Sequence, residues 1–180
     1  VEGALSHSSV LPVGARNITN DLAIGLRISL ESAEKIKLLL NKKEQEVNLP
    51  LERFIISDKK NKEKTDSSDD IDLIQLHLPE GLTKVSRKTL IEGIIRPRLN
   101  EIFTMIGLEI KRSGFGGLTP AGIVITGGGA ETKGIVETSK RNLAMQTRAG
   151  IPTNISGLID EIQSSGFATA VGLVLYGSKT

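Results

Sequence analysis

This 180-residue sequence predicts an α/β fold, and three observations support that class. Apolar residues recur at helical spacing between residues 86 and 106. The run 123–126 begins with three apolar β-branched residues, which is typical of a buried parallel strand. Three glycines follow directly, and a second helical pattern begins near Lys133. Strand, glycine turn and helix together form one βα unit.

The first 40 residues are predicted to form a strand and two helices. The strand spans residues 4–11 and is closed by a turn that contains a proline and a glycine. Polar side chains in residues 17–21 can cap an apolar helix that ends near Leu26. A second helix starts at Ser29, and its apolar face consists of Leu30, Ala33, Ile36 and Leu40.

Glu34 and Lys37 lie on the other side of this second helix, three residues apart. A pair at this spacing is usually a solvated ion pair that contributes a few tenths of a kcal/mol. Local sequence alone therefore predicts that both side chains are exposed to solvent.

The middle of the chain is rich in charge. Fifteen of the 30 residues from Asn41 to Asp70 are Lys, Arg, Asp or Glu, and residues 58–70 include no hydrophobic residue. Such a stretch buries too little apolar surface to offset its ordering entropy, so residues 58–70 are predicted to form a mobile loop. The runs 46–49, 54–57 and 71–78 have strand character and fit a small antiparallel sheet.

A long helix is predicted after Ser86, which can cap its first turn. Its apolar positions are Leu90, Ile91, Ile94, Ile95, Leu99, Ile102, Phe103 and Ile106. Pro97 lies inside this helix and costs roughly 3 kcal/mol, whereas each buried side chain contributes on the order of 1.5–3 kcal/mol. We therefore expect one kinked helix, in which the proline displaces the carbonyl of Gly93.

The last third of the chain is rich in turns, since 13 of the 19 glycines lie between Gly114 and Gly177. A helix over residues 133–143 follows the glycine turn. A strand over residues 145–148, a turn at Gly150 and a buried helix over residues 165–176 complete the prediction.

The composition argues against several classes of function. With 23 Lys and Arg against 21 Asp and Glu, and 3% aromatic residues, nucleic-acid binding is not expected. The chain has no cysteine and only two histidines, His7 and His77, so neither a metal site nor a catalytic residue is predicted. The longest apolar run, residues 167–176, has ten residues with Thr169 and Gly172 among them, about half of the roughly 20 that a membrane span needs.

The glycine turn is the main local candidate for a ligand site. Gly127, Gly128 and Gly129 would let the backbone approach a ligand closely, but the segment matches neither the dinucleotide-binding fingerprint nor the P-loop. A tight βα turn without a ligand remains the alternative. A group of basic residues is likewise either a set of solubility charges or a dock for an acidic peptide: Lys84, Arg87, Lys88, Arg96 and Arg98.

Taken together, these segments resemble the FtsA family of bacterial cell-division proteins, within the actin-like ATPase superfamily. The segments that carry the resemblance are NITNDLA (17–23), VSR (85–87), IRPR (95–98), EIF (101–103) and ITGGGAETKG (125–134). The ending agrees as well, with GIP (150–152), GLID (157–160) and ATAVGL (168–173). The resemblance extends along the chain except for about residues 41–82, where the family itself varies.

The resemblance implies the second lobe of an actin-like ATPase, a ribonuclease H-like fold. Subdomain 2A would comprise residues 1–40 and 113–180, and subdomain 2B would comprise residues 41–112. The full-length protein would bind ATP and Mg²⁺, and whether this chain binds ATP alone is left open. By the same resemblance, the adenosine contacts would be Glu34, Lys37, Gly127, Gly128, Gly129 and Ala130.

No Asp-Gly turn occurs in the sequence. By the resemblance, the phosphate-binding loops would precede Val1, so we expect this chain alone not to hydrolyse ATP.

The resemblance also implies a role in linking the tubulin-like protein FtsZ to the inner face of the cytoplasmic membrane at the division site, with self-assembly into filaments. Membrane contact would come only from a C-terminal helix beyond this sequence. The acidic C-terminal peptide of FtsZ would bind subdomain 2B, with Arg87, Lys88, Arg96 and Arg98 as candidates. Two alternatives stay open: an actin-like nucleotide-binding scaffold of type IV pilus assembly, and a free-standing enzyme with a Rossmann-like site.

Overall fold

The computed structural model describes residues 5–42, 69–153 and 160–178. Its α-helices are α1 (Ala15–Leu26), α2 (Leu30–Lys42), α3 (Arg96–Arg112), α4 (Ile135–Leu143) and α5 (Ala168–Gly177). Its strands are β1 (Asp70–Asp72), β2 (Lys84–Ser86), β3 (Ile123–Ile125) and β4 (Thr147–Ala149). Shorter helical segments are η1 (Ile74–Leu76), η2 (Thr89–Ile95), η3 (Gly128–Glu131), η4 (Asp160–Gln163) and η5 (Ser165–Phe167).

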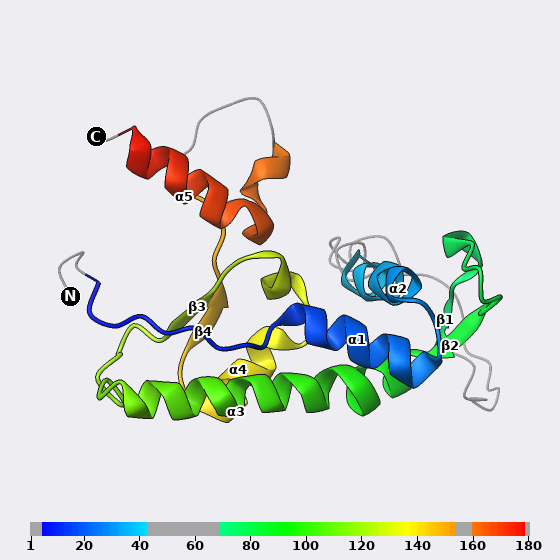
Figure 1. Ribbon diagram of the computed structural model, residues 1–180, viewed down its shortest axis with the longest axis horizontal. Helices are drawn as coiled ribbons and strands as arrows, with labels where there is room; N and C mark the ends of the chain where they lie inside the picture. The colour runs from blue at the N-terminus through cyan, green and yellow to red at the C-terminus, as the bar shows by residue number, and fades with distance from the viewer. Residues whose placement is uncertain (1–4, 43–68, 154–159, 179–180) are drawn as a thin grey trace, which may run out of the picture.

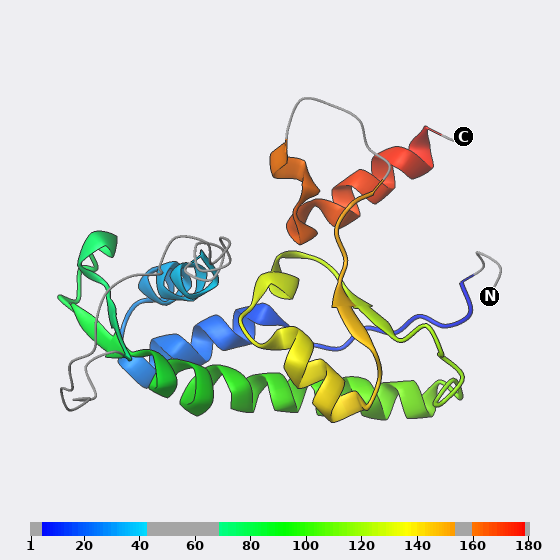
Figure 2. The same ribbon diagram turned by 180° about the vertical axis from the view of Figure 1, so that it is seen from behind.

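The described strands form two small sheets near different ends of α3 (Figures 1 and 2). β1 pairs with β2 in antiparallel fashion, with Ile71 opposite Val85. β3 pairs with β4 in parallel, with Val124 opposite Arg148, and the intervening chain contains α4. The predicted βα unit and the parallel direction of its strand are therefore confirmed, and the strand expected over residues 145–148 is found as β4 at Thr147–Ala149.

A continuous helical rod formed by η2 and α3 runs along the molecule (Figure 1). The backbone stays right-handed helical at Ile95 and Arg96, so the prediction of one helix through Pro97 is confirmed. The N–H of Arg96 donates to the carbonyl of Ile91, five residues back, which makes η2 π-helical. This wider turn lies immediately before Pro97, whose ring clashes with a regular α-helical turn. The kink and the displaced carbonyl of Gly93 stay predictions.

The hydrophobic core lies between α1, α2, the β1–β2 hairpin and the η2–α3 rod. Its buried members are Ile18, Leu22, Ala23, Ala33, Ile36, Leu40, Ile71, Leu73, Leu78, Leu90, Ile95, Leu99 and Phe103. The predicted apolar face of α2 is buried except for Leu30, which is exposed. The core takes residues from both sides of the boundary expected near residue 40, and the division into two subdomains stays a prediction.

Three predictions about exposed segments are wrong. Residues 5–11 are irregular, and residues 5–10 are exposed, because no described strand pairs with them and an isolated strand has no partner for its backbone groups. α5 is helical as expected, but Leu173 and Tyr176 are 68% and 75% exposed, because this helix stands apart from α1 to α4 (Figures 1 and 2). Val124 of β3 is also exposed, since its sheet has only two described strands.

The charged middle of the chain is described only in part. Runs 46–49 and 54–57 and most of the loop 58–70 lie outside the described residues. Within 71–78 only the first two residues belong to a strand, and η1 follows. The Asp72 carboxylate accepts the N–H of Ile74 at 2.8 Å and turns the chain there, as Asp side chains often do.

Candidate functional site

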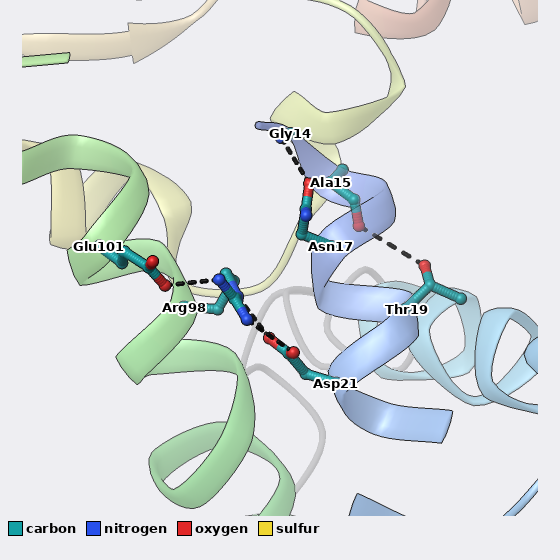
Figure 3. Close-up of polar contacts among 7 residues, drawn as sticks. All are labelled: Gly14, Ala15, Asn17, Thr19, Asp21, Arg98 and Glu101. Carbon is teal, nitrogen blue, oxygen red and sulfur yellow. Dashed lines mark hydrogen bonds and ion pairs between the residues drawn. The ribbon is translucent and has the colours of Figure 1, made fainter. Parts of the chain in front are cut away.

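The start of α1 positions one side of the site. The helix begins at Ala15, earlier than the polar run 17–21 suggested, because Asn17 caps it from inside its first turn. The Asn17 Oδ1 accepts the N–H of Gly14 at 3.0 Å (Figure 3). Gly14 has no side chain with which to cap the helix, so Asn17 takes over part of that function. Thr19 then follows in the second turn and is buried.

The other side of the site is α2, whose N-terminus is capped twice. Ser29 Oγ accepts the N–H of Ser32 at 3.2 Å, which is the hydrogen bond of an N-cap serine. Glu80, from the turn between η1 and β2, accepts the N–H of Ser29 and the hydroxyl of Ser32, both at 2.8 Å. These hydrogen bonds, the one from the Ser29 N–H first, lower the pKa of Glu80 to about 2. Two caps therefore fix the start of the helix that carries Glu34 and Lys37.

Thr19, Glu34 and Lys37 form a compact polar cluster between α1 and α2. The Lys37 Nζ lies 2.7 Å from Glu34 Oε2 and 2.8 Å from Thr19 Oγ1. Thr19 Oγ1 lies 2.6 Å from the same oxygen of Glu34. Lys37 is only 7% exposed, so the expectation of a fully solvated pair is wrong. The reason is tertiary, since α1 packs on α2 and supplies Thr19 as a partner for the ammonium group.

The cluster keeps Glu34 ionised. Burial acts to raise the pKa of this carboxyl group, but the hydrogen bonds from Lys37 and Thr19 together outweigh it, and the pKa lies below its usual value. Glu34 and Lys37 therefore form a charged pair whose total charge is near zero. A half-buried pair of this kind can accept and donate hydrogen bonds without a large charge of either sign.

A pocket of about 540 Å³ opens beside this cluster and reaches the glycine turn. Its lining joins α1, α2 and η3 through Ala15, Arg16, Thr19, Asn20, Leu30, Glu31, Glu34, Lys37, Leu38, Asn41, Gly128, Gly129 and Glu131. One pocket therefore contains four of the six predicted adenosine contacts: Glu34, Lys37, Gly128 and Gly129. The first two lie more than 90 residues before the last two in the sequence.

The other two predicted contacts, Gly127 and Ala130, are not among the residues that line this pocket. Gly127 donates its N–H to the carbonyl of Ser165 at 2.9 Å, which ties the turn to η5. Ala130 is buried. Gly127 and Ala130 therefore stabilise the turn.

The three glycines of the turn meet different requirements. Gly127 has φ of 88°, a conformation that other L-residues rarely adopt. A Cβ added to Gly129 would lie 3.1 Å from the Cβ of Ala15, a tight contact, so the close approach of η3 to α1 favours a glycine there. A Cβ added to Gly128 would meet no atom within 4 Å. At Gly128, therefore, the backbone itself is open to the pocket.

Of the four basic residues proposed to bind a partner, Arg98 pairs with two carboxylates of the protein itself. Its Nε and Nη2 lie 2.5 and 2.8 Å from the two carboxylate oxygens of Asp21, and its Nη1 lies 2.5 Å from Glu101 Oε2 (Figure 3). The hydrogen bond to Asp21 is the main reason that the pKa of Arg98 is raised. Arg98 therefore clamps α3 to α1.

The remaining three lie around η2. Arg96 forms an ion pair with Glu92, one turn back. At the other end of η2, the backbone N–H groups of Arg87 and Lys88 donate to Asp69. The candidate residues thus lie at two ends of one helical segment, and their role in partner binding stays a prediction.

Thr19 was not singled out by the sequence reasoning, although it belongs to the polar cluster. One local signal was present: Thr19 lies between Ile18 and Leu22, two positions on the buried face of α1. A hydroxyl so close to a core face needs a hydrogen-bond partner. Its partners come from α2, and one sequence does not reveal that pairing.

Two further features concern the described residues only. They include no group of three or more His, Cys, Asp or Glu side chains placed to hold a metal ion. None of their helices combines the length and the hydropathy needed to span a bilayer.

Comparison with known proteins gives a consistent result. The model of the family "Cell division protein FtsA" matches residues 1–172. The chain is 32% identical to cell division protein FtsA of Pseudomonas aeruginosa over 98% of the chain, and 36% identical to that of Rhizobium meliloti over 97%. It is 30% identical to cell division protein FtsA of Escherichia coli K12 over 99% of the chain. The aligned parts cover 38%, 36% and 40% of these relatives, so the chain spans about two fifths of their length.

The mixed helices and strands, with a glycine turn after a parallel strand, fit an α/β protein of the actin-like class. Within that class, the chain belongs to the cell division protein FtsA family. The resemblance found in the sequence is confirmed, and the alternative of a pilus-assembly scaffold is not favoured.

Proposed function

We propose that this chain contributes one wall of an adenine-nucleotide site to an FtsA-family protein that acts in cell division. The observation that carries the proposal is the pocket that joins Thr19, Glu34 and Lys37 to Gly128 and Gly129. Its volume, about 540 Å³, falls within the roughly 300–1,000 Å³ of small-molecule sites. A nucleoside is a flat base joined to a sugar with hydroxyl groups, and the two sides of the pocket suit these two parts.

The residues of the pocket fit such a ligand. The open backbone at Gly128 leaves room for a flat base, because no side chain stands in front of it. Both hydrogen bonds within the cluster fall on Oε2 of Glu34, which leaves Oε1 for a hydroxyl donor. Lys37 offers only donors, so the pair can bind groups of both kinds. Bound ATP would supply the phosphoanhydride bonds, and the residues described above would act on its nucleoside end only.

Substitution of Gly128 tests the proposal directly. Gly128→Ala adds a methyl group in open space, so the fold is expected to remain intact while the pocket loses room for a base. Adenosine titrated into the 180-residue chain and followed by NMR should bind roughly tenfold more weakly to this variant. The matched control is Gly93→Ala, an exposed helical glycine with equal space around it. Equal affinities for adenosine in both variants, or no binding by the unsubstituted chain, would contradict the proposal.

We also propose, from family membership, that the protein links FtsZ to the inner face of the cytoplasmic membrane at the division site and assembles into filaments. Arg87, Lys88, Arg96 and Arg98 are the proposed contacts for the acidic C-terminal peptide of FtsZ. Lys88→Glu is the most direct test, because Arg98→Glu would also break the clamp to Asp21. Fluorescence anisotropy with the labelled peptide should show weaker binding than for the control Lys140→Glu in α4. An unchanged dissociation constant across reversals of all four residues would remove this proposal.

A further inference from the structure

The polar cluster indicates a function for Thr19, and this inference rests on the nucleotide site proposed above. The directions of its hydrogen bonds follow from the chemistry of the groups. A lysine ammonium can only donate, an ionised carboxylate can only accept, and a hydroxyl has one proton to donate. Lys37 therefore donates to Thr19 and to Glu34, and Thr19 donates to Glu34. Each contact in this triangle has one consistent direction.

One competing acceptor exists for the Thr19 proton. The carbonyl of Ala15, one turn back in α1, lies 3.5 Å from Thr19 Oγ1 (Figure 3). That separation is at the outer limit for a hydrogen bond, whereas Glu34 Oε2 lies 2.6 Å away and is charged. The proton therefore points to Glu34, across the interface between α1 and α2.

We propose that Thr19 is a positioning residue of the nucleotide site, which holds the Glu34 carboxylate and the Lys37 ammonium in place through its single hydroxyl group. Without the hydroxyl, only Lys37 would hold the carboxylate, and the ammonium would lose its partner in α1. The half-exposed Glu34 would then move among several rotamers, and Oε1 would no longer point in one direction.

Thr19→Val is the variant that tests this proposal, because it keeps the shape of the side chain and removes the hydroxyl. The first measurement needs no ligand: the carboxyl carbon of Glu34 is titrated by NMR and assigned with Glu34→Gln. The pKa of Glu34 should be higher in Thr19→Val than in the unsubstituted chain, because one of the two bonds that lower it is lost. Thr19→Ser, which restores the hydroxyl, should restore the titration.

The second measurement is adenosine affinity, which should fall roughly tenfold in Thr19→Val and recover in Thr19→Ser. Thr104→Val is the matched control, since the Thr104 hydroxyl bonds only within its own helix, to the carbonyl of Asn100 at 2.8 Å. If Thr19→Val does not fold, Thr19→Ala replaces it.

An unchanged pKa of Glu34 in Thr19→Val, or a pKa shift in Thr19→Ser equal to that in Thr19→Val, would overturn the proposal that Thr19 is a positioning residue. Absence of adenosine binding by the unsubstituted chain would instead contradict the proposed nucleotide site, so the two failures are distinguishable.

Discussion

At the scale of single residues, the ion pair between Arg98 and Asp21 shows how charge contributes to this fold. Both side chains are about three-quarters buried, and the guanidinium meets the carboxylate through two parallel contacts. Paired geometry of this kind is more favourable than a single exposed contact, because less side-chain freedom is lost per hydrogen bond. Arg98 of α3 and Asp21 of α1 are 77 positions apart in the sequence, so their ion pair stabilises tertiary structure directly.

Replacement of Arg98 by Met should lower the free energy of unfolding by about 1 kcal/mol, since the Asp21 carboxylate would stay largely buried without its partner. Urea unfolding of Arg98→Met, Asp21→Asn and the double variant measures the coupling energy as a cycle. The control is Arg112→Met in the same helix, because Arg112 is 77% exposed and lies 3.9 Å from Glu109. A coupling energy of zero between Arg98 and Asp21 would show that the pair contributes nothing.

At the scale of elements, the site depends on how α2 is held at its start. Glu80 comes from a turn 51 residues after Ser29, and it accepts one backbone and one side-chain hydrogen bond at the first turn of α2. A carboxylate at this end of a helix is also favoured by the helix dipole. The β1–β2 hairpin and α2 are thereby coupled through one ionised group.

The stability of the fold should therefore depend on pH through Glu80. Its pKa falls from 4.5 to about 2 in the folded protein, so its stabilising effect is complete above 4.5 and is lost as the pH falls towards 2. Chemical unfolding at several pH values should show the unsubstituted chain more stable than Glu80→Gln at neutral pH. This difference should shrink between about pH 4.5 and pH 2. The control is Glu137→Gln at the exposed start of α4, and a difference for Glu80 that is independent of pH would contradict the prediction.

At the scale of the whole molecule, the described residues line the pocket that we propose as the nucleoside side of a nucleotide site. The chain spans about two fifths of its relatives' length, and it includes no Asp-Gly turn. Phosphoryl transfer depends on charges placed around the phosphates and on a bound metal ion.

We accordingly expect the 180-residue chain to show no ATP hydrolysis of its own. Phosphate release from ATP and Mg²⁺ should match that of a sample without protein, even at concentrations at which adenosine binds. A sample of Gly128→Ala serves as a second control, because any true turnover in the pocket should fall with it. Turnover above background in the unsubstituted chain, reduced in Gly128→Ala, would contradict the expectation.

The sequence by itself determined the α-helices, the βα unit and the glycine turn of this protein. These features depend on local periodicity and on residues such as Ser29 and Gly127, whose conformational preferences act over a few positions. It also carried enough similarity to indicate the family, which the comparisons confirmed.

Tertiary structure alone decided how the site is built. Lys37 is buried rather than exposed because α1 covers it. Thr19 belongs to the cluster because its hydroxyl faces Glu34 across the interface between α1 and α2. The same holds for the exposed α5 and for residues 5–11, whose burial depends on which elements lie beside them. A pattern along one chain fixes which face of a helix is apolar, whereas burial and hydrogen bonding depend on the partner that packs there.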